Sequence, residues 1–331
     1  MKLSRHKQKI RSIAVLCSGG DAPGMNAALR GVVRYGIANG LTVFGVYKGY
    51  SGLLKGNWEV MDRKSVANII LRGGTVLKTD RCPEFHKKSY REKAVDQLRG
   101  QGIDGLIVIG GDGSFRGAHA LWGEFKFPVI GIPGTIDNDI TGTEATLGFD
   151  TAVNNALEAI DKIRDTASAH ERTFIVEVMG RNSGYIALDV GIGGGAEAIL
   201  MPEYRAPVSE IASRIARGIE RGKTSSIVVM AEGKESGGSM RLASELKKKY
   251  GIDAKVCILG HLQRGGSPTA RDRLLGSIMG VRSVEALLAG YTDCMVGVIG
   301  DSEVLVPLPM TVKRSAKLRK DLVEMAKILA T

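Results

Sequence analysis

The sequence predicts an α/β protein with mostly parallel sheets. Short apolar runs rich in β-branched residues alternate with stretches of helical periodicity, and these runs lack the polar alternation of a sheet with one solvated face. Glycine, acidic and basic residues directly follow several of the runs, and 331 residues are enough for two domains. We therefore expect sheets covered by helices on both faces, with ligands bound at the carboxyl ends of the strands.

Composition and charge exclude several classes of protein. No apolar run approaches the roughly 20 residues needed to span a bilayer, so we expect no membrane partner and a cytoplasmic location. The net charge of +11 lies mainly at the ends, with +5 in residues 1–11 and +4 in residues 312–331. The nearly neutral body contains no basic run interleaved with aromatics, so we expect no nucleic-acid partner. The four cysteines lack C-x-x-C spacing, which suggests neither a zinc site nor a disulfide framework.

Glycine-rich turns follow two predicted strands in the first third of the chain. The strand at residues 11–17 leads through a turn at residues 18–24 into a helix that starts at Met25. The strand that starts at Gly105 leads into residues 110–114, whose glycines let phosphate oxygens approach backbone N–H groups and whose Asp112 can hold Mg²⁺. An ordinary glycine turn is the alternative, since the segment matches neither the P-loop nor the dinucleotide fingerprint. We also expect a strand at residues 42–47 and a helix near residues 87–99.

Two carboxylates follow the next apolar run, residues 127–130. The run ends in the polar segment 131–143, which carries Asp137 and Asp139 two residues apart. At the carboxyl end of a strand, such a pair suits a proton acceptor beside a metal ligand. A polar turn with a helix cap explains the segment equally well when it is taken alone. The neighbouring phosphate-type turn favours the chemical interpretation.

The second half of the chain continues the alternation of strands and helices. We expect a helix at residues 151–164, and the last residues, 313–331, should form one basic amphipathic helix that packs on the body. The other predicted helices cover residues 208–221 and 240–250, and the predicted strand segments are 173–181, 198–203, 226–232 and 255–264.

Basic side chains stand at or near the ends of these predicted strands. Arginine's planar fork binds phosphate oxygens in pairs and histidine adds a donor, so the set suits a doubly anionic substrate. A surface ion pair is the alternative for any single arginine. Combined with the phosphate turn and the two carboxylates, the set predicts phosphoryl transfer to a phosphorylated small molecule. Its members are Arg172, Arg181, His261 and Arg264.

Five motifs in order make the chain resemble the bacterial 6-phosphofructokinases from about Ile13 to Gly300. They are residues 18–27, 110–114, 133–139, 177–181 and 260–268. The resemblance implies two α/β/α domains with the active site in the cleft between them. Residues 1–147 plus 263–313 would form a nucleotide-binding large domain, and residues 148–262 plus 314–331 a sugar-phosphate-binding small domain. The family's usual assembly is a homotetramer.

The resemblance also implies roles for individual residues. Asp137 would take the proton from the 1-hydroxyl of fructose 6-phosphate, Thr135 and Arg181 would steady the transferred phosphoryl group, and Asp139 would support Mg²⁺. The implied ATP site consists of Gly20, Arg81, Cys82, Gly111, Asp112, Gly113 and Ser114, with Asp112 as the Mg²⁺ ligand. The remaining implied sugar-phosphate contacts are Arg172, Met179, Gly180, Glu232, Lys255, His261 and Arg264, of which Arg172 and Lys255 would come from a neighbouring subunit.

Three positions bear on sugar-phosphate affinity and on the identity of the phosphoryl donor. Lys255 stands where the family usually has arginine, so it keeps the charge but loses the bidentate fork. Gly113 and Gly134 stand where relatives that use pyrophosphate carry Asp and Lys. The two glycines leave room for the α-phosphate of a nucleotide, which favours ATP as the donor.

An effector site is implied as well, with activation by ADP and inhibition by phosphoenolpyruvate. Arg30 and Arg34 are four residues apart and therefore share a helix face, for which simple solvation is the alternative. The implied effector residues are Arg30, Arg34, Arg63, Arg164, Glu197, Arg221 and Lys223.

The first hypothesis is an ATP-dependent kinase that makes fructose 1,6-bisphosphate, and three other functions are alternatives to it. A pyrophosphate-dependent enzyme would differ in donor preference. A non-catalytic sensing subunit is disfavoured because Asp112, Asp137 and Arg181 are all present. A nicotinamide oxidoreductase would need G-x-G-x-x-G after its first strand, and this chain has no such motif there.

Overall fold

The structure is a computed structural model that describes residues 2–168, 172–204, 206–233, 237–312 and 318–330. The chain forms two compact units. The first unit consists of Met1–Ile136, Ile140–Asp150 and Arg264–Ala316, and the second consists of Asp137–Asp139, Thr151–Gln263 and Lys317–Thr331. No helix among the described residues is both long and apolar enough to cross a membrane.

In the described part of the first unit, a seven-stranded sheet has the order β13-β12-β6-β5-β2-β3-β4. Its five inner strands run parallel, whereas β4 and β13 run antiparallel at the two edges. Central strands such as β2 and β5 are buried along their whole length, as expected of parallel strands covered on both faces. The bounds are β2 (Ser12–Ser18), β3 (Thr42–Val46), β4 (Trp58–Met61), β5 (Gly105–Gly110), β6 (Val129–Pro133), β12 (Cys294–Ile299) and β13 (Ser302–Pro307).

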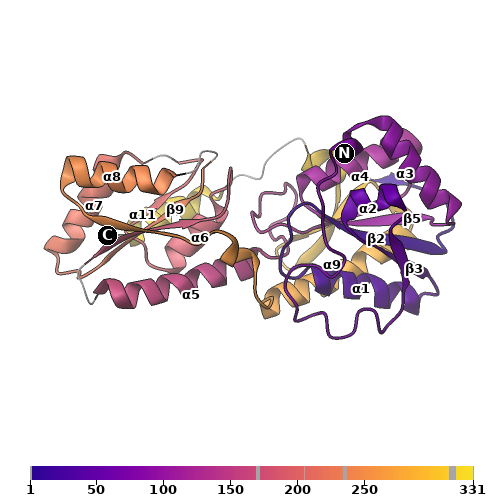
Figure 1. The fold of residues 1–331 in the computed structure, drawn as a ribbon, viewed down its shortest axis with the longest axis horizontal. Helices are drawn as coiled ribbons and strands as arrows, with labels where there is room; N and C mark the ends of the chain where they lie inside the picture. The colour runs from indigo at the N-terminus through magenta and orange to yellow at the C-terminus, as the bar shows by residue number, and fades with distance from the viewer. Residues whose placement is uncertain (1, 169–171, 205, 234–236, 313–317, 331) are drawn as a thin grey trace. The chain divides into compact units, whose positions relative to one another are not determined.

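Helices cover both faces of this sheet (Figure 1). One face carries α1 (Met25–Ala38) and α9 (Ala270–Leu288), and the other carries α2 (Gly49–Lys55), α3 (Lys88–Gly100), α4 (Asp112–Phe125) and α10 (Leu308–Thr311). The core beneath the second group includes Phe115 and Phe127, which are almost fully buried. The first unit therefore has the α/β/α arrangement that the sequence predicts.

Helices α1 and α9 approach each other closely because glycines line their contact. A Cβ atom built on Gly31 would lie 2.8 Å from the carbonyl oxygen of Ser277, and one built on Gly276 would lie 2.7 Å from the carbonyl oxygen of Gly24. A Cβ on Gly280 would overlap the carbonyl oxygen of Ala28. Real Cβ atoms do not come this close, so the two backbones are in direct contact along the helix pair.

The described residues of the second unit form a four-stranded parallel sheet in the order β10-β7-β9-β8. Helices α7 (Val208–Glu220) and α8 (Gly238–Tyr250) pack on one face, around Ile211, Ile215 and Leu246. Figure 1 shows α5 (Phe149–Ser168) on the side of the sheet opposite α8. The other elements are β7 (Thr173–Val178), α6 (Tyr185–Gly193), β8 (Ala198–Leu200), β9 (Ser226–Ala231), β10 (Ala254–Ile258) and α11 (Lys320–Leu329).

These two units confirm the predicted α/β class with mostly parallel sheets. Several short elements were not predicted, among them the pairing of β1 (Ser4–Arg5) with β11 (Tyr291–Thr292) and the antiparallel hairpin of β12 with β13. The single helix expected at residues 313–331 is shorter, since α11 begins at Lys320; residues 313–317 and 331 lie outside the described part. Val323 and Ala326 are buried, so α11 does pack its apolar side on the body.

Candidate active site

In the first unit, the carboxyl ends of three parallel strands lie side by side. Ser18 at the end of β2 pairs with Gly110 at the end of β5, and Gly110 pairs with Pro133 at the end of β6. The hydroxyl of Ser114 donates a hydrogen bond of 2.9 Å to the carbonyl oxygen of Ser18. The sheet therefore brings the turn after β2 and the start of α4 together, as the sequence predicts for a phosphate site.

The start of α4 is open to solvent. Its N-cap residue, Gly111, makes no side-chain cap hydrogen bond, and a Cβ atom built on Gly113 would meet nothing within 4 Å. Asp112 accepts a 2.6 Å hydrogen bond from the Gly113 N–H, pairs with Arg116 at 2.7 Å, and keeps 56% of its side chain exposed. The positive end of the helix dipole favours an anion, and the exposed acid of the first turn lies beside that position.

The resemblance implies a magnesium ion, and the side chains around Asp112 show what could bind it. Among the described residues, no group of three or more His, Cys, Asp or Glu side chains is arranged to hold a metal. Mg²⁺ is commonly bound by one or two carboxylates together with substrate phosphates and water. The exposed carboxylate of Asp112 beside a helix start fits that mode, in which the phosphates supply the other ligands.

Arg264 lies against the glycine-rich turn after β2. Its Nη1 donates a 2.8 Å hydrogen bond to the carbonyl oxygen of Asp21, and a Cβ atom on Gly20 would lie 2.9 Å from the same nitrogen. The structure thus brings together Gly20, assigned to the nucleotide, and Arg264, assigned to the sugar phosphate. Arg81 is exposed, and burial raises the pKa of the neighbouring Cys82 thiol, which disfavours the reactive thiolate.

In the second unit, a tight turn follows β7 and contacts Asp137. The Ser183 N–H donates to the Gly180 carbonyl oxygen at 2.7 Å, and the Ser183 hydroxyl donates to the backbone oxygen of Asp137 at 2.8 Å. Arg181, inside this turn, has a φ of 47°, a left-handed conformation that non-glycine residues rarely adopt. Such conformations concentrate at functional sites. The turn therefore places Arg181 near the backbone of the predicted base.

Residues that follow β7, β9 and β10 meet at one edge of the second sheet. The Met179 N–H donates to Gln263 Oε1 at 2.7 Å, and the Glu232 N–H donates to the Val178 carbonyl oxygen at 2.7 Å. His261 lies in the short 3-10 helix η2 (Gly260–Arg264) that follows β10. Met179, Glu232 and His261 thus share the carboxyl edge, as expected for substrate contacts.

Arg172 and Lys255 lie elsewhere in the second unit. Arg172 directly precedes β7, and Lys255 is the second residue of β10, paired with Phe174. Both are therefore at the amino edge of the sheet, opposite Arg181. Lys255 pairs with Asp253 at 2.9 Å, and the hydrogen bonds from Lys255 and Lys247 lower the pKa of Asp253 to about 2.

A cavity of about 810 Å³ adjoins Arg181, and the sequence did not predict most of its lining. Its described walls include Met201 and Tyr204 from the segment after β8, Met230 from β9 itself, and Arg241 from the first turn of α8. In the sequence, methionine and tyrosine at these positions are typical of core residues. No polar pattern therefore indicated that they line a cavity.

The predicted effector residues fall in both units. Arg164 donates to the carbonyl oxygens of Gly194 and Gly195 at 2.5 and 3.1 Å. Glu197, 2% exposed, pairs with Lys223 at 3.2 Å and accepts a hydrogen bond from the backbone N–H of Ile227. Arg221 and Lys223 line a small pocket with two further cations that the sequence analysis did not single out, Arg214 and Arg217. The members in the first unit are Arg30 and Arg34 on α1 and Arg63 after β4.

Comparison with known proteins identifies relatives along nearly the whole chain. A sequence model of the family described as Phosphofructokinase matches residues 12–287. The protein named ATP-dependent 6-phosphofructokinase from Thermotoga neapolitana is 52% identical over 97% of this chain and 100% of its own length. The protein of the same name from Halothermothrix orenii is 48% identical, with the same two coverages.

Solved structures agree with this relationship. The Pichia pastoris phosphofructokinase in the T-state superposes with a TM-score of 0.85 at 33% identity, covering 98% of this chain and 39% of that chain. This chain thus spans about two fifths of the yeast chain. The pyrophosphate-dependent phosphofructokinase from Marinobacter aquaeolei superposes with a TM-score of 0.83 at 24% identity, covering 94% and 86% of the two chains, and shares the fold.

These findings define a phosphotransferase built from two α/β units. The chain belongs to the phosphofructokinase family.

Proposed function

We propose that the protein is an ATP-dependent 6-phosphofructokinase that converts D-fructose 6-phosphate into fructose 1,6-bisphosphate, the committed step of glycolysis. The observation that carries this proposal is the open helix start at residues 111–114, where Gly113 leaves space beside Asp112. The curated relatives at about half identity carry the same name over their full lengths, which supports ATP rather than pyrophosphate as the donor.

In the proposed reaction, Asp137 accepts the proton of the sugar's 1-hydroxyl while that oxygen attacks the γ-phosphorus of ATP. Arg181 and Thr135 stabilise the negative charge on the transferred group, and ADP leaves with the bridging oxygen. Asp112, supported by Asp139, would hold Mg²⁺, which neutralises charge on the phosphates when bound. The proposal assigns ATP mainly to the first unit and the sugar phosphate mainly to the second, with Arg264 as the exception.

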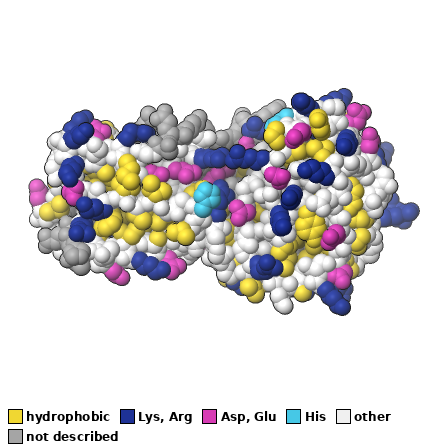
Figure 2. All heavy atoms as spheres, in the orientation of Figure 1, with side chains coloured by type: hydrophobic (Ala, Val, Ile, Leu, Met, Phe, Trp, Pro, Cys, Tyr) yellow, Lys and Arg dark blue, Asp and Glu magenta, His cyan; other side chains and the backbone are white. Residues whose placement is uncertain are grey.

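We further propose a homotetramer whose active sites are shared between subunits. Arg172 and Lys255 lie at the sheet edge opposite Arg181, so their assignment to the sugar phosphate requires a second copy of the chain. The edge strand β10 leaves Ile258 52% exposed, and η2 leaves Leu262 76% exposed. Figure 2 shows hydrophobic side chains gathered on the visible face of the second unit. An uncovered edge strand and exposed apolar residues are what a subunit contact would bury.

Regulation by ADP and phosphoenolpyruvate belongs to the same proposal. The basic residues near Glu197, namely Arg164, Arg221 and Lys223, suit phosphate groups of an effector. Allosteric control also requires that the effector binds two states of the enzyme with different affinity. We propose a cytoplasmic location, where both substrates are found.

The test is a coupled assay on purified protein with fructose 6-phosphate and Mg²⁺, comparing ATP with pyrophosphate. ATP-driven turnover that responds to ADP and phosphoenolpyruvate is the expected result. Turnover with pyrophosphate alone would replace ATP as the donor, and no turnover with either would overturn the proposed activity.

A further inference from the structure

Asn26, the second residue of α1, is fully buried and has no part in the proposed reaction. Its amide group bonds to a distant loop. Nδ2 donates to the carbonyl oxygens of Arg72 and Gly73 at 2.9 and 3.4 Å, and Oδ1 accepts from the Val76 N–H at 2.9 Å. One side chain therefore holds both ends of the turn at residues 72–76, using its donor and its acceptor.

The held turn belongs to a long irregular segment. Between β4, which ends at Met61, and η1 (Pro83–His86), the described chain contains no helix or strand. Irregular segments of this length inside a compact unit are uncommon and are usually functional. Because this segment has no ladder of its own backbone hydrogen bonds, its shape depends on contacts such as those of Asn26.

Other contacts fix the same turn against the candidate site. The hydroxyl of Ser267 donates to the Leu71 carbonyl oxygen at 2.7 Å, and a Cβ atom on Gly73 would overlap the carbonyl oxygen of Gly266. Thr75 donates to the sulfur of Cys17, near the end of β2, at 3.1 Å. The turn thus lies between the segment that follows Arg264 and the strand that leads to Gly20.

We propose that Asn26 is a positioning residue that holds the 72–76 turn, and through it the segment leading to Arg81 and Cys82, in the shape that nucleotide binding needs. This inference rests on the proposed function. An amide is required because it donates and accepts in one plane, whereas a carboxylate accepts only. At this buried position a carboxylate would face the Arg72 oxygen and lose the donor half of the contact.

The test compares Asn26→Asp with Asn39→Asp, which makes the same chemical change at the exposed C-terminal end of the same helix, where the Asn39 amide donates to the nearby carbonyl oxygen of Tyr35. We expect Asn26→Asp to raise the KM for ATP roughly tenfold, about the loss of one buried hydrogen bond, with kcat changed less than threefold. Backbone amide exchange, measured by mass spectrometry, should become faster in peptides covering residues 71–77. Asn39→Asp should change neither quantity.

The outcomes separate this inference from the proposed function. An unchanged KM for ATP in Asn26→Asp, or an equal loss for both substrates that parallels a loss of folded protein, would overturn the positioning role. Absence of ATP-driven turnover in the wild-type protein would instead overturn the proposed activity. Even then, unchanged amide exchange at residues 71–77 in Asn26→Asp would refute the idea that Asn26 holds the turn. If Asn26→Asp does not fold, Ser267→Ala removes the bond from this exposed residue to Leu71, directly before the turn, and we expect about a threefold rise in KM for ATP. No rise would overturn the inference.

Discussion

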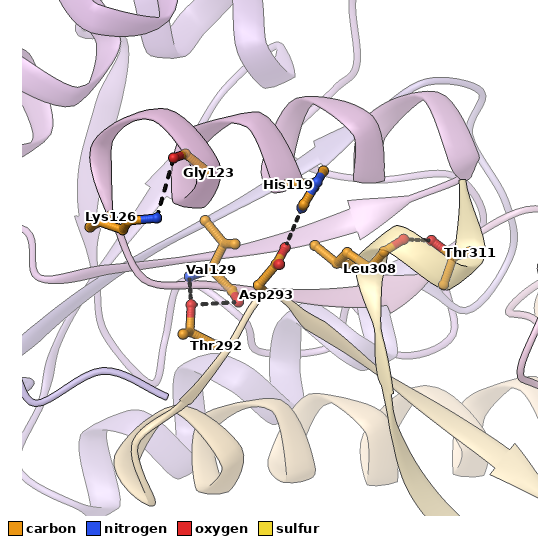
Figure 3. A network of polar contacts seen from close by, with 8 residues as sticks. All are labelled: His119, Gly123, Lys126, Val129, Thr292, Asp293, Leu308 and Thr311. Atoms are coloured by element: carbon orange, nitrogen blue, oxygen red, sulfur yellow. Dashed lines mark hydrogen bonds and ion pairs between the residues drawn. The ribbon is translucent and has the colours of Figure 1, made fainter. Parts of the chain in front are cut away.

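Nδ1 of His119 on α4 and Oδ1 of Asp293, between β11 and β12, are hydrogen-bonded at 2.8 Å in the first unit (Figure 3). The Asp293 side chain is 6% exposed and that of His119 is 39% exposed. The backbone of Asp293 also donates to the Val129 oxygen and accepts from the Leu308 N–H, each at 2.9 Å. The pair therefore ties the helix that begins at Asp112 to β6 and α10 of the same unit.

The first prediction concerns the stability that this pair supplies. Burial raises the pKa of Asp293, and the hydrogen bond from His119 opposes that rise. A raised carboxyl pKa means that ionisation costs folding stability as the pH rises through it. His119→Ala should therefore lower the free energy of unfolding by about 1–3 kcal/mol at pH 7, and by less where Asp293 is protonated.

Urea denaturation of wild type, His119→Ala, Asp293→Asn and the double variant at pH 7 and pH 4 checks this. Additive effects of the two substitutions at pH 7 would show that the pair contributes nothing.

Asp137 is predicted to act as the general base. Asp137→Asn keeps the size of the side chain but cannot accept the proton, so kcat should fall by about 10²–10⁴ while the affinity for fructose 6-phosphate changes little. Because Ser183 bonds to the backbone oxygen of Asp137, the substitution leaves that contact in place. Steady-state kinetics and equilibrium binding of the sugar phosphate measure the two quantities. Near-normal turnover would remove Asp137 from the role.

Gly113 should determine how well ATP is accepted as the donor. An aspartate fits there without strain, since a Cβ would meet nothing within 4 Å, but its charge would repel the phosphates of ATP. Gly113→Asp should lower kcat/KM for ATP about tenfold to a hundredfold. Gly123→Asp is the matched control, because Gly123 lies on the same helix and is equally open. Equal kinetics for the two variants would separate Gly113 from the nucleotide.

Lys255 offers a test of the proposed shared site. Lys255→Arg restores a bidentate donor and should lower the KM for fructose 6-phosphate a few-fold. Lys247→Arg is the control, because Lys247 pairs with the same Asp253 yet has no assigned substrate contact. A KM that is unchanged in Lys255→Arg, or lowered equally in the control, would argue against contact with the sugar phosphate.

Arg164 should matter for regulation alone. It bonds the Gly194 and Gly195 carbonyl oxygens beside Glu197, so Arg164→Ala removes a cation from the proposed effector site. We expect the ADP concentration for half-maximal activation to rise about tenfold, with unregulated turnover nearly constant. Lys162→Ala, on the same helix and exposed, is the control. A full ADP response in Arg164→Ala would exclude the residue from the site.

The interior of the fold was predictable because buried parallel strands are continuous apolar runs. Apolar runs such as those of β2 and β5 fit few structures other than a buried strand, and the turns after them contain glycine. The edges were not predictable. Trp58–Met61 and Ser302–Pro307 are half-exposed strands whose pairing depends on neighbours far along the chain, which local patterns do not encode.

The candidate site likewise contains some residues that could be predicted from the sequence and others that could not. Residues shortly after strands, such as Asp112 and Arg181, could be proposed from the sequence because a strand end fixes their place. Asn26 could not, because a buried asparagine near a helix start looks like any polar residue of a first turn. Its partners at residues 72–76 lie some 50 residues further along the chain, and only folding brings them together.

The glycine contact between α1 and α9 has a consequence for the two loops that precede these helices. One loop carries Gly20 and the other follows Arg264, so each continues directly into one member of a helix pair whose backbones touch. Side chains between ordinary helices can be exchanged to move the helices apart, but at the close contacts of Gly31, Gly276 and Gly280 there are none to exchange. The distance between the two loops is thus set by the main chain itself. Mutation can therefore change the side chains on the loops more readily than the distance between the loops.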